Sequence, residues 1–319
     1  MPHNPTSPTP PARTPWQGRG ELVGLPVHLM QLLAAVLVAL GATEGAAPVP
    51  PDDAVFRPGE AGYACFRAPS LTYTADGRRL LAIVEAYHYH CVSREWCDIV
   101  QKVSTDGGHT FSAVELVHGT GRDGGNTSSP CFQNVSPTLD PTTGELFLPF
   151  HADYYAAGSP IVAGTATLLV SSTDGGGSYS AARDVSAAFA HGVPSMPGGT
   201  ALEGRLIVPV YRTGTCPSGK KVAAAGRQFC SYLVLSDTHG RSWRAGAEAA
   251  NGSECQAATL ANGSVLLNMR DSSPAPGSLS EEPPLHATSS ARVASRGGGL
   301  GARRMARSDD GGVGQHEHF

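Results

Sequence analysis

The stretch Ser104-Thr-Asp-Gly-Gly-His-Thr-Phe111 decides the fold, because its pattern, Ser-x-Asp-x-Gly-x-x-aromatic, recurs along the chain. We call each occurrence a box. The later boxes are Ser172-Thr-Asp-Gly-Gly-Gly-Ser-Tyr179, Ser236-Asp-Thr-His-Gly-Arg-Ser-Trp243 and the shorter Ser308-Asp-Asp-Gly-Gly312. The third box has Thr238 at the Asp position, and the fourth has Gln315 where the aromatic residue should stand. The serines are 68, 64 and 72 residues apart, and such even spacing indicates one structural unit that is used repeatedly.

Each box has the composition of a tight turn that follows a strand. A short carboxylate can accept hydrogen bonds from backbone N–H groups of its own turn, and the glycine permits a positive φ. The aromatic residue can anchor the turn against its sheet. We therefore expect a structural role for the box residues Ser104, Asp106, Gly108, Phe111, Ser172, Asp174, Gly176, Tyr179, Ser236, Gly240 and Trp243.

The body of the chain, from about Val55 to Arg270, predicts an all-β fold. No stretch of it keeps a 3.6-residue apolar period over three turns, whereas short β-prone runs are bounded by Gly, Asp, Asn or Pro. These runs are Leu80–Val84, Leu146–Phe150, Thr167–Val170, Leu206–Tyr211, Tyr232–Leu235 and Val265–Leu267.

Composition narrows the class of protein. The 319 residues carry a formal net charge of −4 at pH 7, which argues against nucleic acid as a partner. Charged residues make up only 16%, while 39 glycines and 25 prolines suit many short strands joined by tight turns. No Gly-rich loop follows a strand and opens a helix, so nucleotide chemistry has no support.

Residues 1–50 differ from the body and predict a disordered N-terminus with a signal-peptide-like segment at 29–47. The apolar run Leu29–Leu40 is too short to cross a bilayer of about 30 Å as a helix, but it suits the core of a signal peptide. A buried core helix is the alternative. We expect no stable membrane span and a secreted or extracellular protein, or one in an endomembrane or lysosome-like compartment.

Seven cysteines agree with export, because disulfides persist in oxidising compartments. Cys216 and Cys230 bracket a polar loop, Cys91 and Cys97 could close a shorter one, and the odd count leaves one thiol unpaired. Potential zinc ligands occur in two stretches, but neither spacing matches a zinc template, so we expect no metal. They are His88, His90, Cys91 and Cys97, and the pair His316 and His318. Four sequons fit a secreted surface, at Asn126, Asn134, Asn251 and Asn262.

The boxes resemble the Asp boxes of the sialidase (neuraminidase) superfamily, and three further segments extend the resemblance from about Phe56 to Asp271. They are Phe66-Arg67-Ala-Pro69, similar to the family's Phe-Arg-Ile-Pro motif, Gly198–Pro209, and Ser253-Glu254-Cys-Gln256 with Leu267-Asn-Met-Arg270. The resemblance implies a six-bladed β-propeller, of which this chain would hold about four blades. The propeller would occupy residues 51–271, before a low-complexity tail, 272–319, with a degenerate fourth box.

The same resemblance implies an exo-α-sialidase, a retaining glycoside hydrolase that removes terminal sialic acid from glycoconjugates without a cofactor. Arg67 and Arg270 would bind the carboxylate of the sugar, because a planar guanidinium suits bidentate contacts. A carboxylate nucleophile would be repelled by that substrate, so the family uses a tyrosine. Glu254 would take the proton from this tyrosine.

The sequence departs from the family's pattern in three places. No tyrosine follows Glu254, and the family's third arginine should follow the fourth box, where the sequence has only seven more residues. The acid/base aspartate falls at or near Ser93; Asp98 and Glu95 are nearby carboxylates, although Asp98 also suits a strand. These departures leave two alternatives open, a lectin-like propeller that binds acidic sugars without cleaving them and an interaction scaffold.

Overall fold

The computed structural model describes residues 54–91, 96–119, 130–155, 162–221, 229–271 and 303–313. All the described residues belong to the compact unit Ala54–Phe319. The predicted N-terminus 1–50 with its signal-peptide-like segment, Glu95, and residues 272–302 and 314–319 of the predicted tail lie outside the described residues. Within the described ranges, none of the helical turns is long and apolar enough to span a membrane.

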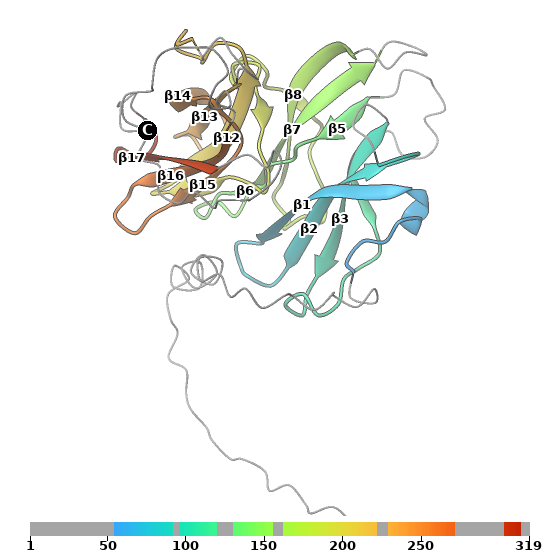
Figure 1. The fold of residues 1–319 in the computed structure, drawn as a ribbon. Coiled ribbons are helices and arrows are strands. Elements are labelled where there is room, and N and C mark those ends of the chain that lie inside the picture. The colour runs from blue at the N-terminus through green and yellow to red at the C-terminus, as the bar shows by residue number, and fades with distance from the viewer. Residues whose placement is uncertain are drawn as a thin grey trace, which may run out of the picture. The chain divides into compact units, whose positions relative to one another are not determined.

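The first two blades share one nine-stranded sheet (Figure 1). After a short 3-10 turn, η2 (Glu60–Gly62), the first blade consists of β1 (Cys65–Tyr73), β2 (Leu80–Tyr87), β3 (Cys97–Ser104) and β4 (Glu115–His118). The second blade consists of β5 (Cys131–Gln133), β6 (Thr138–Leu139), β7 (Leu146–Tyr155), β8 (Val162–Ser172) and β9 (Arg183–Asp184). Pairing within each blade is antiparallel, and one parallel pair, Cys97 with Cys131, joins the two blades.

Two further antiparallel sheets form the third and fourth blades. The third blade has β10 (Val193–Pro194), β11 (Thr200–Leu202), β12 (Arg205–Thr213), β13 (Phe229–Ser236) and β14 (Arg244–Ala250). The fourth has β15 (Gly252–Thr259), β16 (Val265–Asp271) and β17 (Arg303–Ser308). Every apolar run that predicted a strand lies in one, which confirms the all-β class. The described strands make four propeller blades and do not close into a ring.

Each box begins at the last residue of a strand, which is β3 for the first box, β8 for the second, β13 for the third and β17 for the fourth. In the first box, Ser104 accepts a hydrogen bond from the N–H of Gly108 at 2.8 Å and donates to Asp106 at 2.7 Å. Asp106 in turn accepts from the N–H of Thr110 at 2.9 Å. The hydroxyl of Thr110 and these other donors hold the pKa of Asp106 well below its usual range. The second box repeats the contacts with Ser172, Gly176, Asp174 and Ser178.

The two boxes that depart from the sequence pattern keep hydrogen bonds like those of the first two boxes. In the third box the hydroxyl of Thr238 replaces the carboxylate and accepts from the N–H of Ser242 at 2.9 Å. In the fourth box the hydroxyl of Ser308 donates to Asp310 and accepts from the N–H of Gly312. The fourth box therefore ends a strand of the fourth blade, although the sequence around it suggested a tail.

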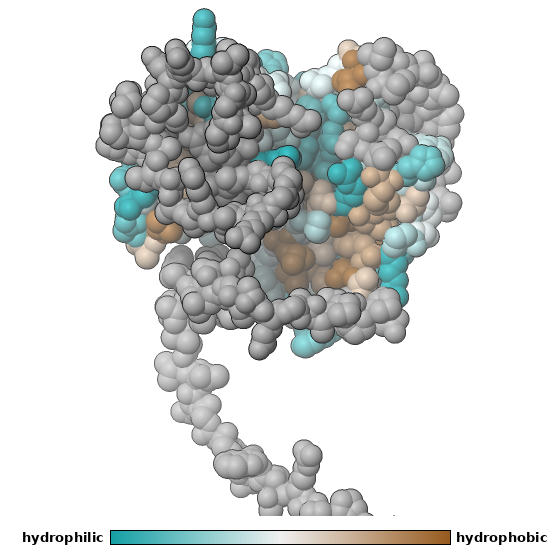
Figure 2. Space-filling view, viewed as in Figure 1, coloured by the Kyte–Doolittle hydropathy of each residue, from teal (hydrophilic) through white to brown (hydrophobic). Residues whose placement is uncertain are grey.

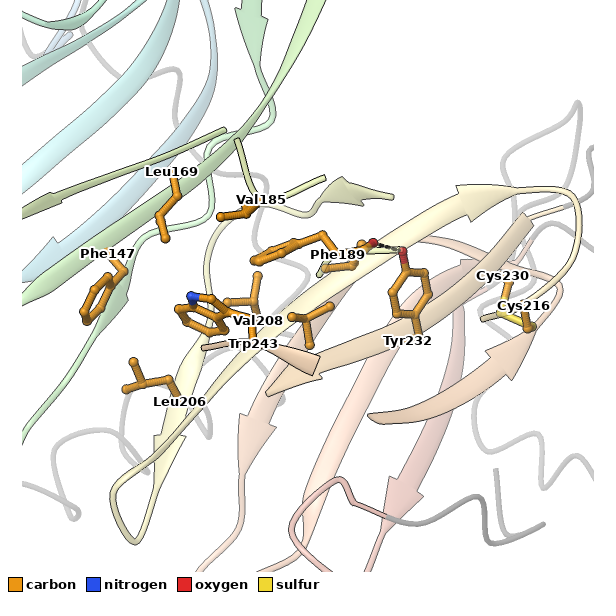
Figure 3. Close-up of a cluster of buried hydrophobic side chains, with 12 residues drawn as sticks. Phe147, Leu169, Val185, Phe189, Leu206, Val208, Cys216, Cys230, Tyr232 and Trp243 are labelled. Atoms are coloured by element: carbon orange, nitrogen blue, oxygen red, sulfur yellow. Dashed lines mark hydrogen bonds between the residues drawn. A yellow bond between two sulfur atoms is a disulfide. The ribbon is translucent and has the colours of Figure 1, made fainter. Parts of the chain in front are cut away.

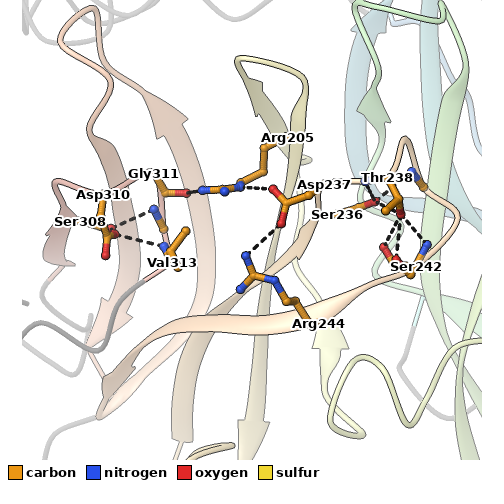
Figure 4. Close-up of polar contacts among 12 residues, drawn as sticks. Arg205, Ser236, Asp237, Thr238, Ser242, Arg244, Ser308, Asp310, Gly311 and Val313 are labelled. Atoms are coloured by element: carbon orange, nitrogen blue, oxygen red, sulfur yellow. Dashed lines mark hydrogen bonds and ion pairs between the residues drawn. The ribbon is translucent and has the colours of Figure 1, made fainter.

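Each box from the second to the fourth also packs on the blade before it. Arg79 in the first blade donates to the carbonyl of Gly175 in the second box at 3.4 Å. At the next junction, Asp140 of the second blade contacts His239 of the third box at 2.7 Å. Arg205 of the third blade donates to the carbonyl of Gly311 in the fourth box at 3.1 Å and to Asp237 of its own blade (Figure 4). The boxes thus join neighbouring blades.

The main apolar core lies between the second and third blades (Figure 3). Trp243 of the third box is 6.0 Å from Phe147 and 5.7 Å from Phe189 between ring centroids. The buried hydroxyl of Tyr232 donates to the carbonyl of Phe189 at 2.6 Å, so this polar group is satisfied inside the core. In Figure 2 apolar surface gathers over the first blade, where Leu71 of β1 is 62% exposed.

The described residues form three disulfides, of which Cys97–Cys131 joins the first two blades, whereas Cys65–Cys91 lies in the first blade and Cys216–Cys230 in the third. The predicted Cys216–Cys230 pair is confirmed. The predicted Cys91–Cys97 pair is wrong, because Cys91 is bonded to Cys65 and Cys97 to Cys131. Strand register explains the difference, since β3 pairs with β5 at Cys97 and Cys131. The one free cysteine of the described chain is Cys255, which is fully buried.

Candidate functional site

Glu254 and Arg270 form an ion pair on neighbouring strands of the fourth blade. Arg270 Nη1 donates to Glu254 Oε1 at 2.9 Å, and both side chains are about half exposed. The pairing of β15 with β16 shifts register between Ser253 and Gln256, and Glu254 has a positive φ of 42°. A bulge of this kind re-aims a side chain. An exposed ion pair of this kind adds little to stability.

Glu254 lines a cavity of about 270 Å³. Three of the other lining side chains carry amides, Asn134, Gln256 and Asn268, and the cavity is completed by Ser195, Met196 and Pro197. Gln256 and Asn268 are direct neighbours across β15 and β16. Asn268 Oδ1 is buried and accepts no hydrogen bond from another described residue.

Arg67 lies opposite Glu85 in the β1–β2 pair. Glu85 is buried and accepts hydrogen bonds from the N–H of Asn134 at 2.7 Å and the hydroxyl of Tyr87 at 2.8 Å. Burial raises the pKa of Glu85, although these two donors and Arg67 act against the shift. The guanidinium of Arg67 is 5.6 Å from the centre of the Tyr87 ring, and Arg67 itself is exposed.

Asn134 connects the two halves of the site. Its backbone binds Glu85, the neighbour of Arg67, and the same residue lines the cavity with Glu254. Tyr211 of β12 gives a second link. Burial raises its pKa most, and the charges of Glu254, Cys255, Glu85 and Asp153 raise it further. The structure thus brings Glu254 into contact with Arg270 and sets Arg67 opposite Glu85, which is bonded to Asn134 at the cavity that Glu254 lines.

Asp98 does not join this group. It lies opposite Ala86, and because side chains alternate along a strand, it points to the other face of the sheet from Glu85. Asp98 is fully buried, where it accepts from the hydroxyl of Tyr63 at 2.9 Å and contacts His88 Nε2 at 2.9 Å. Glu95, the other predicted acid/base candidate, lies outside the described residues.

Three polar residues of the second blade were missed from the sequence. His151 Nε2 is 3.1 Å from Asp153 Oδ1, and Gln133 donates to the other oxygen of Asp153 at 2.5 Å. The alternation of His151 and Asp153 along β7 was a usable signal, but the apolar run before His151 hid it. Among the potential metal ligands of the sequence, Cys91 and Cys97 are in disulfides and His88 contacts Asp98, while His316 and His318 lie outside the described residues. Cys216, Cys230 and Glu248 cluster, but these cysteines are also a disulfide.

A family model and a curated relative both connect this chain with sialidases. Residues 120–282 match the model of the BNR repeat-like domain. A sialidase of Micromonospora viridifaciens is 32% identical over 272 residues, which is 76% of this chain and 40% of that protein.

Solved structures share the fold at lower identity. A Hadza microbial sialidase matches with a TM-score of 0.60 and 19% identity over 83% of this chain and 48% of the other. A leech intramolecular trans-sialidase, complexed with 2,7-anhydro-Neu5Ac, matches with a TM-score of 0.53 and 16% identity over 68% and 49%. The chain thus spans half or less of the length of these relatives. By its matched domain, its blades and its boxes, the chain belongs to the sialidase superfamily.

Proposed function

We propose that Arg67, Glu254 and Arg270 form an exo-α-sialidase-type site that takes the terminal sialic acid of glycoconjugates. The observation that carries the proposal is the contact of Arg270 with Glu254 at a polar cavity. A sugar that bears a carboxylate needs fixed positive charge with planar donors, and arginine meets this need. Arg270 uses only Nη1 in its contact with Glu254, so its other N–H groups are available to such a ligand within the described site.

Hydrolysis with retention would need a neutral nucleophile, which the family supplies as a tyrosine. Among the described tyrosines, Tyr211 is the one whose pKa is raised by the charge of Glu254. Attack by its oxygen requires Glu254 to accept the phenolic proton. Burial, which raises the pKa of Tyr211, works against that transfer and keeps the hydroxyl as a hydrogen-bond donor.

This environment of Tyr211 favours a second candidate function, lectin-like binding of the same sugar acid without cleavage. Both candidates need Arg67 and Arg270, but only hydrolysis needs Glu254 as a base. The two functions can therefore be separated by one pair of measurements on the same variants.

The test measures release of the fluorophore from a fluorogenic sialoside and, separately, binding of N-acetylneuraminic acid by calorimetry. For a hydrolase, Glu254→Gln should lower kcat by about 100-fold or more, the range of a lost general base. Glu203→Gln, an exposed acid on the turn before β12, is the matched control and should keep wild-type rates. Binding that is lost in Arg270→Gln, without turnover, would support the lectin-like function. Neither binding nor turnover in the wild-type chain would refute the proposal.

We also propose that the protein is exported and meets its sialylated glycans in an extracellular or endomembrane compartment. Its three disulfides support this, because such bonds persist where the environment is oxidising. Fractionation of expressing cells, with the chain followed by an antibody, would test the proposal; recovery in the cytosol would contradict it.

A further inference from the structure

A second hollow of about 520 Å³ lies at the junction of the second and third blades. It is lined by β9, by the segment that follows it to His191, and by residues Arg241 to Trp243 of the third box. It shares no lining residue with the cavity at Glu254. Its volume falls in the range of about 300–1,000 Å³ that is usual for small-molecule sites.

The walls of this hollow are fixed by contacts across the blade junction. Arg183 Nη2 donates to the carbonyl of Gly240 at 2.5 Å, and Trp243 Nε1 donates to the same carbonyl at 3.1 Å. The indole of Trp243 is 8% exposed and packs between Phe147 and Phe189 (Figure 3). A ligand would therefore meet a preformed surface, which lowers the entropic cost of binding.

The charges around the hollow are predominantly positive. Arg183 and Arg241 line it and are exposed, and Arg241 forms no side-chain hydrogen bond or ion pair with another described residue. The one carboxylate, Asp184, accepts a hydrogen bond from the N–H of Ser186 at 2.8 Å. Hydrogen bonds from Ser186 lower the pKa of Asp184, so it is ionised at neutral pH. The hollow is thus lined by the two guanidinium groups of Arg183 and Arg241 and by one carboxylate, Asp184, which already accepts a hydrogen bond from Ser186.

The third box has a neutral residue, Thr238, at the position where the first two boxes have an aspartate. Asp106 and Asp174 occupy the corresponding place in the first two boxes, where they accept from Thr110 and Ser178. In the third box Thr238 makes these contacts with Ser242, and Ser242 lines the hollow. The change from carboxylate to hydroxyl thus leaves no carboxylate at the position that contacts Ser242, and the remaining carboxylate of the box, Asp237, is bonded to Arg205 and Arg244.

We propose that this hollow is a second glycan site that binds an anionic sugar, with the carboxylate or sulfate held by Arg183 and Arg241. The apolar face of the sugar would lie against Val185, Ala188 and the edge of Trp243. Guanidinium groups suit planar carboxylates and sulfates, and a partly apolar floor suits a sugar ring. Two sites on one rigid chain would raise the affinity for a glycan that carries several acidic residues.

The test is a calorimetric titration with three monosaccharides: sulfated N-acetylglucosamine, glucuronic acid and neutral N-acetylglucosamine. Binding of either or both acidic sugars, with at least tenfold weaker binding of the neutral one, is expected, and the better acidic ligand identifies the source of the anion. Arg241→Gln should weaken binding by about tenfold, the effect of a lost charge-assisted hydrogen bond. Arg78→Gln, on an exposed turn, removes an equal charge elsewhere and should change nothing.

Two further variants exclude a loss of fold as the explanation. Thr238→Asp restores the carboxylate of the other boxes, so it should keep the thermal midpoint while weakening binding of the acidic sugars. Ala187→Trp fills the hollow without changing charge and should abolish binding. Equal affinity for all three sugars, or wild-type affinity in both Arg241→Gln and Thr238→Asp, would overturn the proposal. Arg270→Gln should leave this binding intact, which separates the inference from the proposed sialidase site.

Discussion

His239 Nδ1 lies 2.7 Å from Asp140 Oδ2, and this contact joins the third box to the second blade. Asp140 is fully buried and also accepts from the N–H of Thr142 and the hydroxyl of Thr143. Burial raises the pKa of Asp140, but the three donors outweigh it, and the pKa lies below its ordinary value of 3.8. The ionised form of Asp140 therefore stabilises the junction.

Replacing His239 should weaken this junction. His239→Ala leaves a buried carboxylate one partner short, and the expected loss is about 1–3 kcal/mol of unfolding free energy. Urea denaturation at pH 7 measures it. His109→Ala removes an exposed histidine from the first box and should have no effect. Because the pKa of Asp140 is lowered in the fold, its stabilisation is present above pH 3.8 and is lost as the pH falls further. Equal stability of His239→Ala and His109→Ala would contradict the role of His239 in stabilising the junction.

The second box depends on the carboxylate of Asp174. Its oxygens accept from the N–H of Ser178 at 2.9 Å and from the hydroxyl of Ser178 at 2.6 Å. Asp174→Ala should lower the thermal midpoint, whereas Asp174→Asn keeps one acceptor oxygen and should lower it less. Differential scanning calorimetry provides the comparison. A midpoint in Asp174→Ala that matches the wild type would mean that the backbone and Gly176 hold the turn alone.

Glu85 should give stability an opposite dependence on pH. Burial raises its pKa above the ordinary value of 4.5, so the fold favours the protonated form. Its contribution is complete below pH 4.5 and is lost as the pH rises through the folded pKa. Glu85→Gln keeps an acceptor for the N–H of Asn134 and should remove this loss. Urea midpoints measured from pH 4 to pH 8 should fall more for the wild type than for the variant; parallel curves would exclude the effect.

Cys255 should be the only cysteine that an alkylating reagent modifies without prior reduction, and it should be modified only after unfolding. It is fully buried, and burial raises its pKa to about 11. A buried neutral thiol reacts slowly because the thiolate is the nucleophile. Mass spectrometry after alkylation without reductant should show no label on the native protein and one label, on Cys255, in urea. Label on Cys91 or Cys97 would contradict the disulfides of the first blade.

The fold could be predicted from local patterns because each box encodes its own turn. Ser104 and Asp106 bond within a few residues of themselves, so their spacing alone carries the information. The apolar runs marked the central strands for the same reason. The short strands β5, β6, β9 and β10 carry too few residues for a pattern, and only their partners define them.

The candidate site was harder to predict because it depends on register between distant strands. Glu254 and Arg270 were selected by family resemblance, and their contact follows from the pairing of β15 with β16. Whether Asp98 faces the site depends on which side of β3 it occupies, and a change of one residue in register would reverse the answer. Tyr211 precedes Glu254 in the chain, so a search for a tyrosine after that residue could not find it.

The junctions between blades have a direction. The arginine or aspartate of one blade always reaches forward to the turn of the next, as Arg79 does to Gly175 and Arg205 to Gly311. Each blade thus supplies the side chain that attaches it to the following blade. Whole units can then be duplicated or lost during evolution without redesign of the others, so the number of blades can vary more readily than the structure of any one of them.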